Sequence, residues 1–224
     1  MVDSRRLSMI VLTIVAIFVA VNAFAYNADE ALMLLKEGNA RFFAMKTEHL
    51  NINAERRMDT AINGQKPFAV VLACSDSRVP VEAIFDRGIG DIFVVRVAGN
   101  IAIDPSVIGS VEYGVRHLNS PLLVVMGHTN CGAVNASISG PPLEGDVRAI
   151  QKNIEIVAAR VKKDHPALNG DSLESEVVKE NILQAKKDIL AGSGEIRRAA
   201  GEVKLKIVPA VYDLKTGAVK WLLE

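Results

Sequence analysis

The chain has 224 residues, half of them hydrophobic, which suits a globular domain with a sizeable core. Its 26 lysine and arginine residues equal its 26 aspartate and glutamate residues in number, so the formal net charge at pH 7 is zero. Because there is no basic surplus, we expect no nucleic-acid partner.

The first 25 residues combine the three parts of an export signal. Arg5 and Arg6 precede an uncharged, mostly apolar stretch from Leu7 to Ala25, which ends in Ala23-Phe24-Ala25. This order predicts a signal peptide that is cleaved after Ala25. The alternative is an uncleaved N-terminal membrane anchor, because a stretch of this length nearly spans the ~30 Å hydrocarbon core of a bilayer. Only the anchor would keep the protein in contact with a membrane. Both interpretations predict an exported, periplasmic protein, either secreted or anchored on the non-cytoplasmic side.

Residues 26–224 are predicted to form a single domain in which helices alternate with strands. Apolar residues at helical spacing follow Asn27, and a second, short helix is expected over residues 54–62. Continuous apolar runs at 68–73, 91–97 and 121–127 are typical of strands buried on both faces. A helical pattern at 105–118 separates the last two runs. This alternation predicts an α/β fold with a central, mostly parallel β-sheet flanked by helices.

The C-terminal part is predicted to contain charged helices followed by a hairpin. Residues 146–189 have a helical pattern, interrupted around 166–170, and their lysines and glutamates are most simply a solvated helix face. After Gly192-Ser193-Gly194 and a short helix, the segments 203–211 and 218–222 flank a turn at 215–217. We expect the last segment to form an antiparallel edge strand of the sheet.

Both cysteines directly follow predicted strands. Cys74 ends the first strand in the stretch ACSDSRVP, and His128 and Cys131 follow the third strand in GHTNCGAV. One interpretation is a disulfide, which two cysteines form by default in an exported protein. The other is a shared site, because the carboxyl ends of neighbouring parallel strands meet at one edge of the sheet. Two thiolates and an imidazole suit Zn²⁺, and three protein ligands leave the fourth position open, as in catalytic zinc sites.

Asp76 and Arg78 lie directly beyond Cys74 and are predicted to control the open position. Zinc lowers the pKa of a bound water toward about 7. Asp76 can accept the hydrogen bond of the resulting hydroxide, and Arg78 can hold the carboxylate by a bidentate contact. The alternative for this pair is a buried structural ion pair. The remaining histidines are predicted to be surface residues: His49, His117 and His165.

The paired motifs CSDSR and HTNC resemble the signature of the β-class carbonic anhydrases, Cys-x-Asp-x-Arg with a later His-x-x-Cys. The resemblance covers nearly all of the chain after residue 27, including LKEGNARF, VVRVAGN, SVEYGVRHL and AVYDLKTGAV. It implies a β-carbonic-anhydrase-like fold and reversible hydration of carbon dioxide to bicarbonate and a proton by zinc-bound hydroxide. The implied ligands of one Zn²⁺ per subunit are Cys74, His128 and Cys131, and the implied catalytic pair is Asp76 with Arg78. In some relatives the aspartate itself binds zinc, so Asp76 can be a fourth ligand in a closed state.

The resemblance is to the plant-type branch, which places a glutamine, a phenylalanine and a tyrosine around the substrate. Gln65, Phe93 and Tyr113 match these positions, and Gly132 is assigned to substrate binding with them. The neighbouring subunit contributes the tyrosine in relatives, so the resemblance implies a homodimer or a dimer of dimers. The small residues of RVAGN (96–100) are expected to let the backbone approach the metal pocket.

Two other functions stay open at this point. One keeps the fold and the zinc but acts on carbon disulfide or carbonyl sulfide. The other is a non-catalytic binding domain in which Cys74 and Cys131 form a disulfide.

Overall fold

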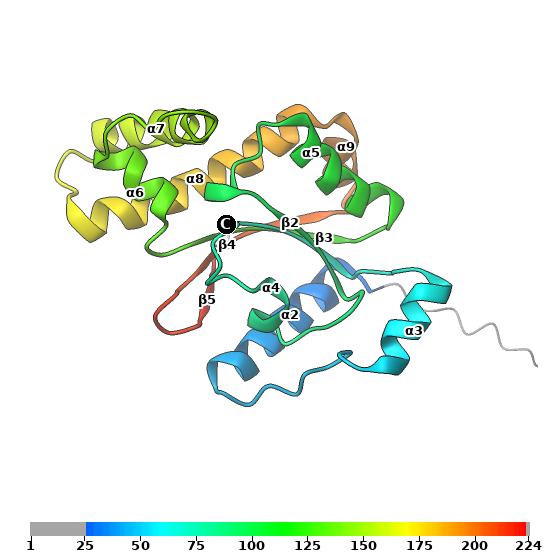
Figure 1. Ribbon diagram of the computed structural model, residues 1–224. Helices are drawn as coiled ribbons and strands as arrows, with labels where there is room; N and C mark the ends of the chain where they lie inside the picture. The colour runs from blue at the N-terminus through cyan, green and yellow to red at the C-terminus, as the bar shows by residue number, and fades with distance from the viewer. Residues whose placement is uncertain (1–25, 223–224) are drawn as a thin grey trace, which may run out of the picture.

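A five-stranded β-sheet forms the centre of the computed structural model (Figure 1). The structure describes residues 26–222, so the predicted signal peptide or anchor at 1–25 lies outside the described residues. The strand order is β2-β1-β3-β4-β5. Neighbouring strands are parallel except for β5, which is antiparallel to β4. This topology confirms the predicted fold class, including the antiparallel edge strand. The strands are β1 (Ala69–Ala73), β2 (Ile92–Arg96), β3 (Leu122–His128), β4 (Lys206–Tyr212) and β5 (Val219–Trp221).

Helices cover both faces of the sheet (Figure 1). Two lie against one face, α2 (Ala28–Phe43) and α4 (Val81–Ile84), and α3 (Ala54–Asn63) follows α2. The opposite face carries α5 (Pro105–Glu112), α6 (Gly132–Ser139), α7 (Val147–Asp164), α8 (Gly170–Gly192) and α9 (Gly194–Gly201). The predicted helix at 105–118 consists of α5 and a π-helical turn, η2 (Tyr113–His117). Between residues 26 and 222, no helix combines the length and apolar character needed to cross a membrane.

Several helices begin where the sequence supplies a capping side chain. Asn27 accepts hydrogen bonds from the backbone of Asp29 and Glu30 at the start of α2. Asn53 and Asp104 cap α3 and α5 in the same way. Such caps satisfy backbone N–H groups that have no partner within the helix, so they determine where each helix starts.

Side chains along β1 point alternately to the two faces of the sheet, so they pack into two apolar clusters, one beneath each layer of helices. Val70 and Leu72 belong to the apolar cluster that includes residues of α7 and α8. Val71 and Ala73 belong to the cluster that includes residues of α2 and α4. Every residue of β1 and β3 is buried, which explains why these strands are apolar apart from His128 at the end of β3. The sheet therefore holds the carboxyl ends of β1 and β3 side by side at a fixed spacing.

Candidate metal centre

Cys74, His128 and Cys131 meet at the carboxyl edge of the sheet. Cys74 follows β1, His128 is the last residue of the neighbouring strand β3, and Cys131 is the N-cap of α6. All three are buried, and their candidate ligand atoms lie within 4.8 Å of one another. Both cysteines are free, so the structure gives no support to the disulfide interpretation. The expected convergence of the three side chains is confirmed.

The His128 ring has the hydrogen-bonding pattern of a metal ligand. Its Nδ1 lies 2.9 Å from the carbonyl oxygen of Thr129. A carbonyl oxygen can only accept, so Nδ1 carries the proton and Nε2 keeps its lone pair. Nε2 is buried and has no hydrogen-bond partner among the described residues. A buried nitrogen without a partner is unfavourable unless something else binds it, and a metal beside two sulfurs fits that need.

The Cys74 sulfur is placed to be a thiolate. A hydrogen bond from the Cys131 thiol, with further ones from backbone N–H groups, lowers the pKa of Cys74 to about 4, although burial opposes the shift. The same Cys74–Cys131 contact, together with burial, raises the pKa of Cys131. Gly99 N donates to Cys74 Sγ at 3.3 Å, which confirms that RVAGN brings backbone to the pocket. Because the thiolate is the form that binds metals, the cluster is prepared for one.

Asp76 and Arg78 form the expected bidentate contact beside the cluster. Arg78 Nε donates to Asp76 Oδ1 at 2.9 Å, and Nη2 donates to Oδ2 at 2.7 Å. The side-chain hydrogen bond from Arg78 holds the pKa of Asp76 well below its usual range. Asp76 Oδ2 lies 3.8 Å from His128 Nε2, so the carboxylate adjoins the candidate metal position. The Arg78 side chain is 55% exposed, which does not fit the alternative of a buried structural pair.

Arg96 and Asn181 also contribute to this region, and neither was identified from the sequence. Arg96 Nε donates to the carbonyl oxygen of Cys74 at 3.2 Å, and Arg96 Nη2 donates to that of Asp76 at 2.6 Å. The guanidinium thus fixes the backbone on both sides of Ser75. The available signal was a single charged residue at the end of an otherwise apolar strand, in the VVRVAGN stretch. Asn181 donates to the backbone of Gly99 from α8, 82 residues away in sequence, and no local signal points to it.

Of the residues predicted to bind substrate, Gly132 lies beside the candidate metal centre, whereas the other three lie away from it. Gly132 adjoins Cys131 at the start of α6, and a Cβ added there would meet no described atom within 4 Å beyond its chain neighbours and its own helix backbone. Gln65 precedes β1, whereas Cys74 follows it, so they lie at opposite ends of that strand. Phe93 pairs with Val70 in β1, and its ring centroid is 5.9 Å from that of Tyr113. Within one chain, Gln65, Phe93 and Tyr113 therefore do not converge on the metal centre.

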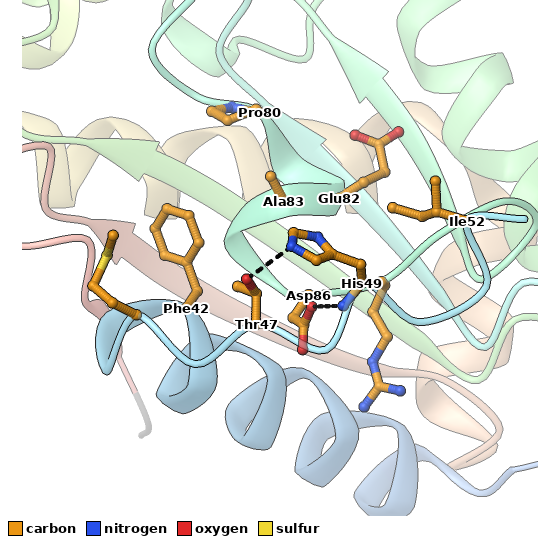
Figure 2. Close-up of a pocket in the computed structure, with 10 residues that line it drawn as sticks. Phe42, Thr47, His49, Ile52, Pro80, Glu82, Ala83 and Asp86 are labelled. Carbon is orange, nitrogen blue, oxygen red and sulfur yellow. Dashed lines mark hydrogen bonds between the residues drawn. The ribbon is translucent and has the colours of Figure 1, made fainter.

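A separate pocket of about 420 Å³ lies between the end of α2, the following loop and α4 (Figure 2). Thr47 and His49 of this loop both line it and point toward each other, with His49 Nε2 3.2 Å from Thr47 Oγ1 (Figure 2). None of the predicted site residues lines this pocket. His49, His117 and His165 are all exposed, as predicted.

The chain is similar to known proteins along most of its length. A family model described as carbonic anhydrase matches residues 69–219. The chain is 39% identical over 195 residues to carbonic anhydrase 2 of Mycobacterium tuberculosis, covering 85% of this chain and 91% of that protein. It is 38% identical over 198 residues to a carbonic anhydrase of Mycolicibacterium smegmatis, covering 87% and 93%. A solved β-carbonic anhydrase of Aspergillus fumigatus matches with a TM-score of 0.69 and 26% identity, covering 87% of this chain and 89% of that one. The chain therefore belongs to the β-class carbonic anhydrase family.

Proposed function

We propose that the protein catalyses the zinc-dependent, reversible hydration of carbon dioxide to bicarbonate and a proton. The observation that carries this proposal is the cluster of Cys74, His128 and Cys131 in a chain of this family. Two sulfurs and one imidazole nitrogen are the donor set that favours Zn²⁺ over oxygen-seeking cations. Three protein ligands leave a position for solvent, which a structural zinc site does not.

The residues around the cluster have separate tasks in this reaction. Cys74, His128 and Cys131 would hold the zinc ion, which would supply the Lewis acidity that activates water near neutral pH. Asp76 remains ionised because Arg78 bonds both of its oxygens, so it can accept a hydrogen bond from the reacting solvent. The same two bonds support an open state in which Asp76 stays with Arg78 and is not a fourth ligand. Gly132 leaves space for substrate beside Cys131.

The proposed active enzyme is a homodimer or a dimer of dimers. Phe93 and Tyr113 lie together on and beside β2, the edge strand of the sheet, and Tyr113 is 48% exposed. An edge strand offers unpaired backbone groups to another chain. We therefore assign Gln65, Phe93 and Tyr113 to the substrate pocket of a second copy.

The proposed location is the periplasm. Its support is the order of positive charge, apolar stretch and Ala-x-Ala ending in the first 25 residues. Comparison of the mature N-terminus with Tyr26 distinguishes a cleaved signal from a retained anchor.

The function is tested by metal analysis combined with stopped-flow hydration of carbon dioxide. We expect about one zinc per chain, and hydration well above the buffer rate that is lost in a Cys131→Ser variant. Carbonyl sulfide and carbon disulfide are assayed in parallel. Zinc-loaded protein that hydrates carbon dioxide only at the buffer rate, or that hydrolyses one of the sulfur compounds instead, would contradict the proposal.

A further inference from the structure

Gly99 links the candidate metal centre to helix α8. Its backbone N–H donates to Cys74 Sγ at 3.3 Å, and its carbonyl oxygen accepts from Asn181 Nδ2 at 2.8 Å. Gly99 lies in a one-turn 3₁₀ segment, η1 (Ala98–Asn100), which Asn100 N closes by donating to the carbonyl oxygen of Val97 at 2.9 Å. A single residue is thus bonded to a metal ligand on one side and to a distant helix on the other.

The position of Gly99 requires glycine. Its φ of +69° lies in the left-handed region, which other residues seldom adopt. A Cβ there would lie 2.6 Å from Ile154 Cδ1 and 3.3 Å from Ala133 Cβ. Neighbouring side chains therefore leave no room for a side chain on the Gly99 Cα, and the Asn181 side chain holds the Gly99 carbonyl group.

Asn181 is a polar residue in an apolar part of the molecule. It is 3% exposed, and the other buried residues of α8 are apolar, including its neighbours Ile182 and Ala185. A buried amide is unfavourable unless it is hydrogen-bonded, and the amide of Asn181 reaches outside its own helix to Gly99. An apolar residue would serve the packing of α8 at least as well, so the amide points to a role in holding the Gly99 turn.

We propose that Asn181 is a positioning residue for the metal ligand Cys74. By holding the Gly99 carbonyl, it keeps the Gly99 N–H directed at the Cys74 sulfur. A hydrogen bond to a thiolate draws electron density from the sulfur and fixes its direction, which tunes how strongly the sulfur binds a metal. This inference rests on the proposed metal site.

The test replaces Asn181 with leucine, which has a similar size but no donor. The full chain is stripped of metal, and its zinc affinity is measured by competition with a chromophoric chelator. We expect the affinity to fall about tenfold, in the range typical of groups that orient metal ligands. In the Co²⁺-loaded protein, the sulfur-to-cobalt absorption band should move to longer wavelength, because the sulfur lone pairs lose a hydrogen bond.

The matched control is Asn39→Leu. Asn39 is also a buried helical asparagine, but its amide donates to the carbonyl oxygens of Ile84 and Gly217, away from the metal centre. This variant should lose thermal stability while its zinc affinity and cobalt band stay unchanged. Parallel changes in both variants would show general loosening of the fold and overturn the inference.

The remaining outcomes also decide the question. An Asn181→Leu protein that matches the wild type in affinity and spectrum would overturn the inference while leaving the proposed function intact. A wild-type protein that takes up neither metal would instead overturn the proposed function. If the leucine variant does not fold, Asn181→Ala replaces it with the same expected shifts. If neither variant folds, Asn181 serves the stability of the whole domain and the inference is overturned.

Discussion

Phe93 and Tyr113, two of the residues predicted to bind substrate, lie too far from the candidate metal centre to serve it within one chain. Phe93 pairs with Val70, and Cys74 comes four residues after Val70. At ~3.3 Å per residue, the separation along the strand is about 13 Å. Aromatic side chains reach neighbours over only about 8 Å in a sheet. We therefore predict that Phe93 and the adjacent Tyr113 serve the metal centre of a second copy.

Complementation between two defective variants tests this prediction. Cys131→Ser loses the metal centre but keeps Tyr113, whereas Tyr113→Ala keeps the centre but loses the ring. Each variant alone should be nearly inactive. In a hybrid dimer, one of the two sites would combine an intact centre with an intact tyrosine. After co-expression, about half of the dimers are hybrids, so about one quarter of all sites should be complete.

The assay is stopped-flow hydration of carbon dioxide on hybrids isolated with two affinity tags. We expect about half of the wild-type activity per hybrid dimer. The control is a hybrid of wild type with a chain that carries both Cys131→Ser and Tyr113→Ala. If tyrosine acts across the interface, this control has no complete site; if it acts within its own chain, the control keeps one. An active control hybrid, together with inactive complementing hybrids, would refute the reasoning.

Three further changes test the pair beside the metal centre and the packing under α2. Arg78→Ala should lower kcat/KM about 10- to 100-fold by releasing Asp76, with little change in unfolding temperature. Arg198→Ala, which breaks another exposed arginine–carboxylate contact, should leave kcat/KM unchanged. Because the hydrogen bond from Arg78 lowers the pKa of Asp76, this carboxylate is ionised at any pH above 3.8, the ordinary aspartate pKa. It loses its charge only when the pH falls through the lower pKa that it has in the folded protein. A wild-type pH–rate profile should therefore show no loss from Asp76 above pH 3.8, and Arg78→Ala should move that loss to higher pH. Gly38→Ala should destabilise the fold by about 2 kcal/mol or more in urea unfolding, because the new Cβ would lie 1.8 Å from the backbone oxygen of Phe85.

The central strands were predictable because burial on both faces leaves a direct mark on composition. β1 and β3 are buried at every position, so β1 and the part of β3 before His128 appear in the sequence as unbroken apolar runs. The C-terminal hairpin was predictable from its turn residues. The pairing of β3 with β4 was not, because strand order depends on which surfaces meet in space and no local pattern records it. The short helix α4 was missed for a related reason, since four residues carry too little periodicity.

The convergence of Cys74, His128 and Cys131 was predictable because each motif sits directly beside a strand end. The residues that orient those ligands are different. Asn181 lies in a segment rich in lysine and glutamate, where a polar residue suggests a solvated face, yet the helix buries it. Nothing in its neighbourhood distinguishes it from the exposed polar residues of α8. Its partner Gly99 comes from another part of the chain, so only the folded structure brings the two together.

This difference between ligands and orienting residues has a physical origin. A ligand must present a particular donor atom, so its residue type is restricted and its motif is recognisable. An orienting residue only needs one hydrogen-bonding group at the right point in space, and any element that passes nearby can supply it. Arg96 does so from the neighbouring strand, Asn181 from a helix on one face of the sheet, and Thr129 with its backbone carbonyl. Relatives with the same three ligands can therefore differ in metal affinity and reactivity through residues that no motif includes, and Asn181→Leu measures how large that contribution is in this chain.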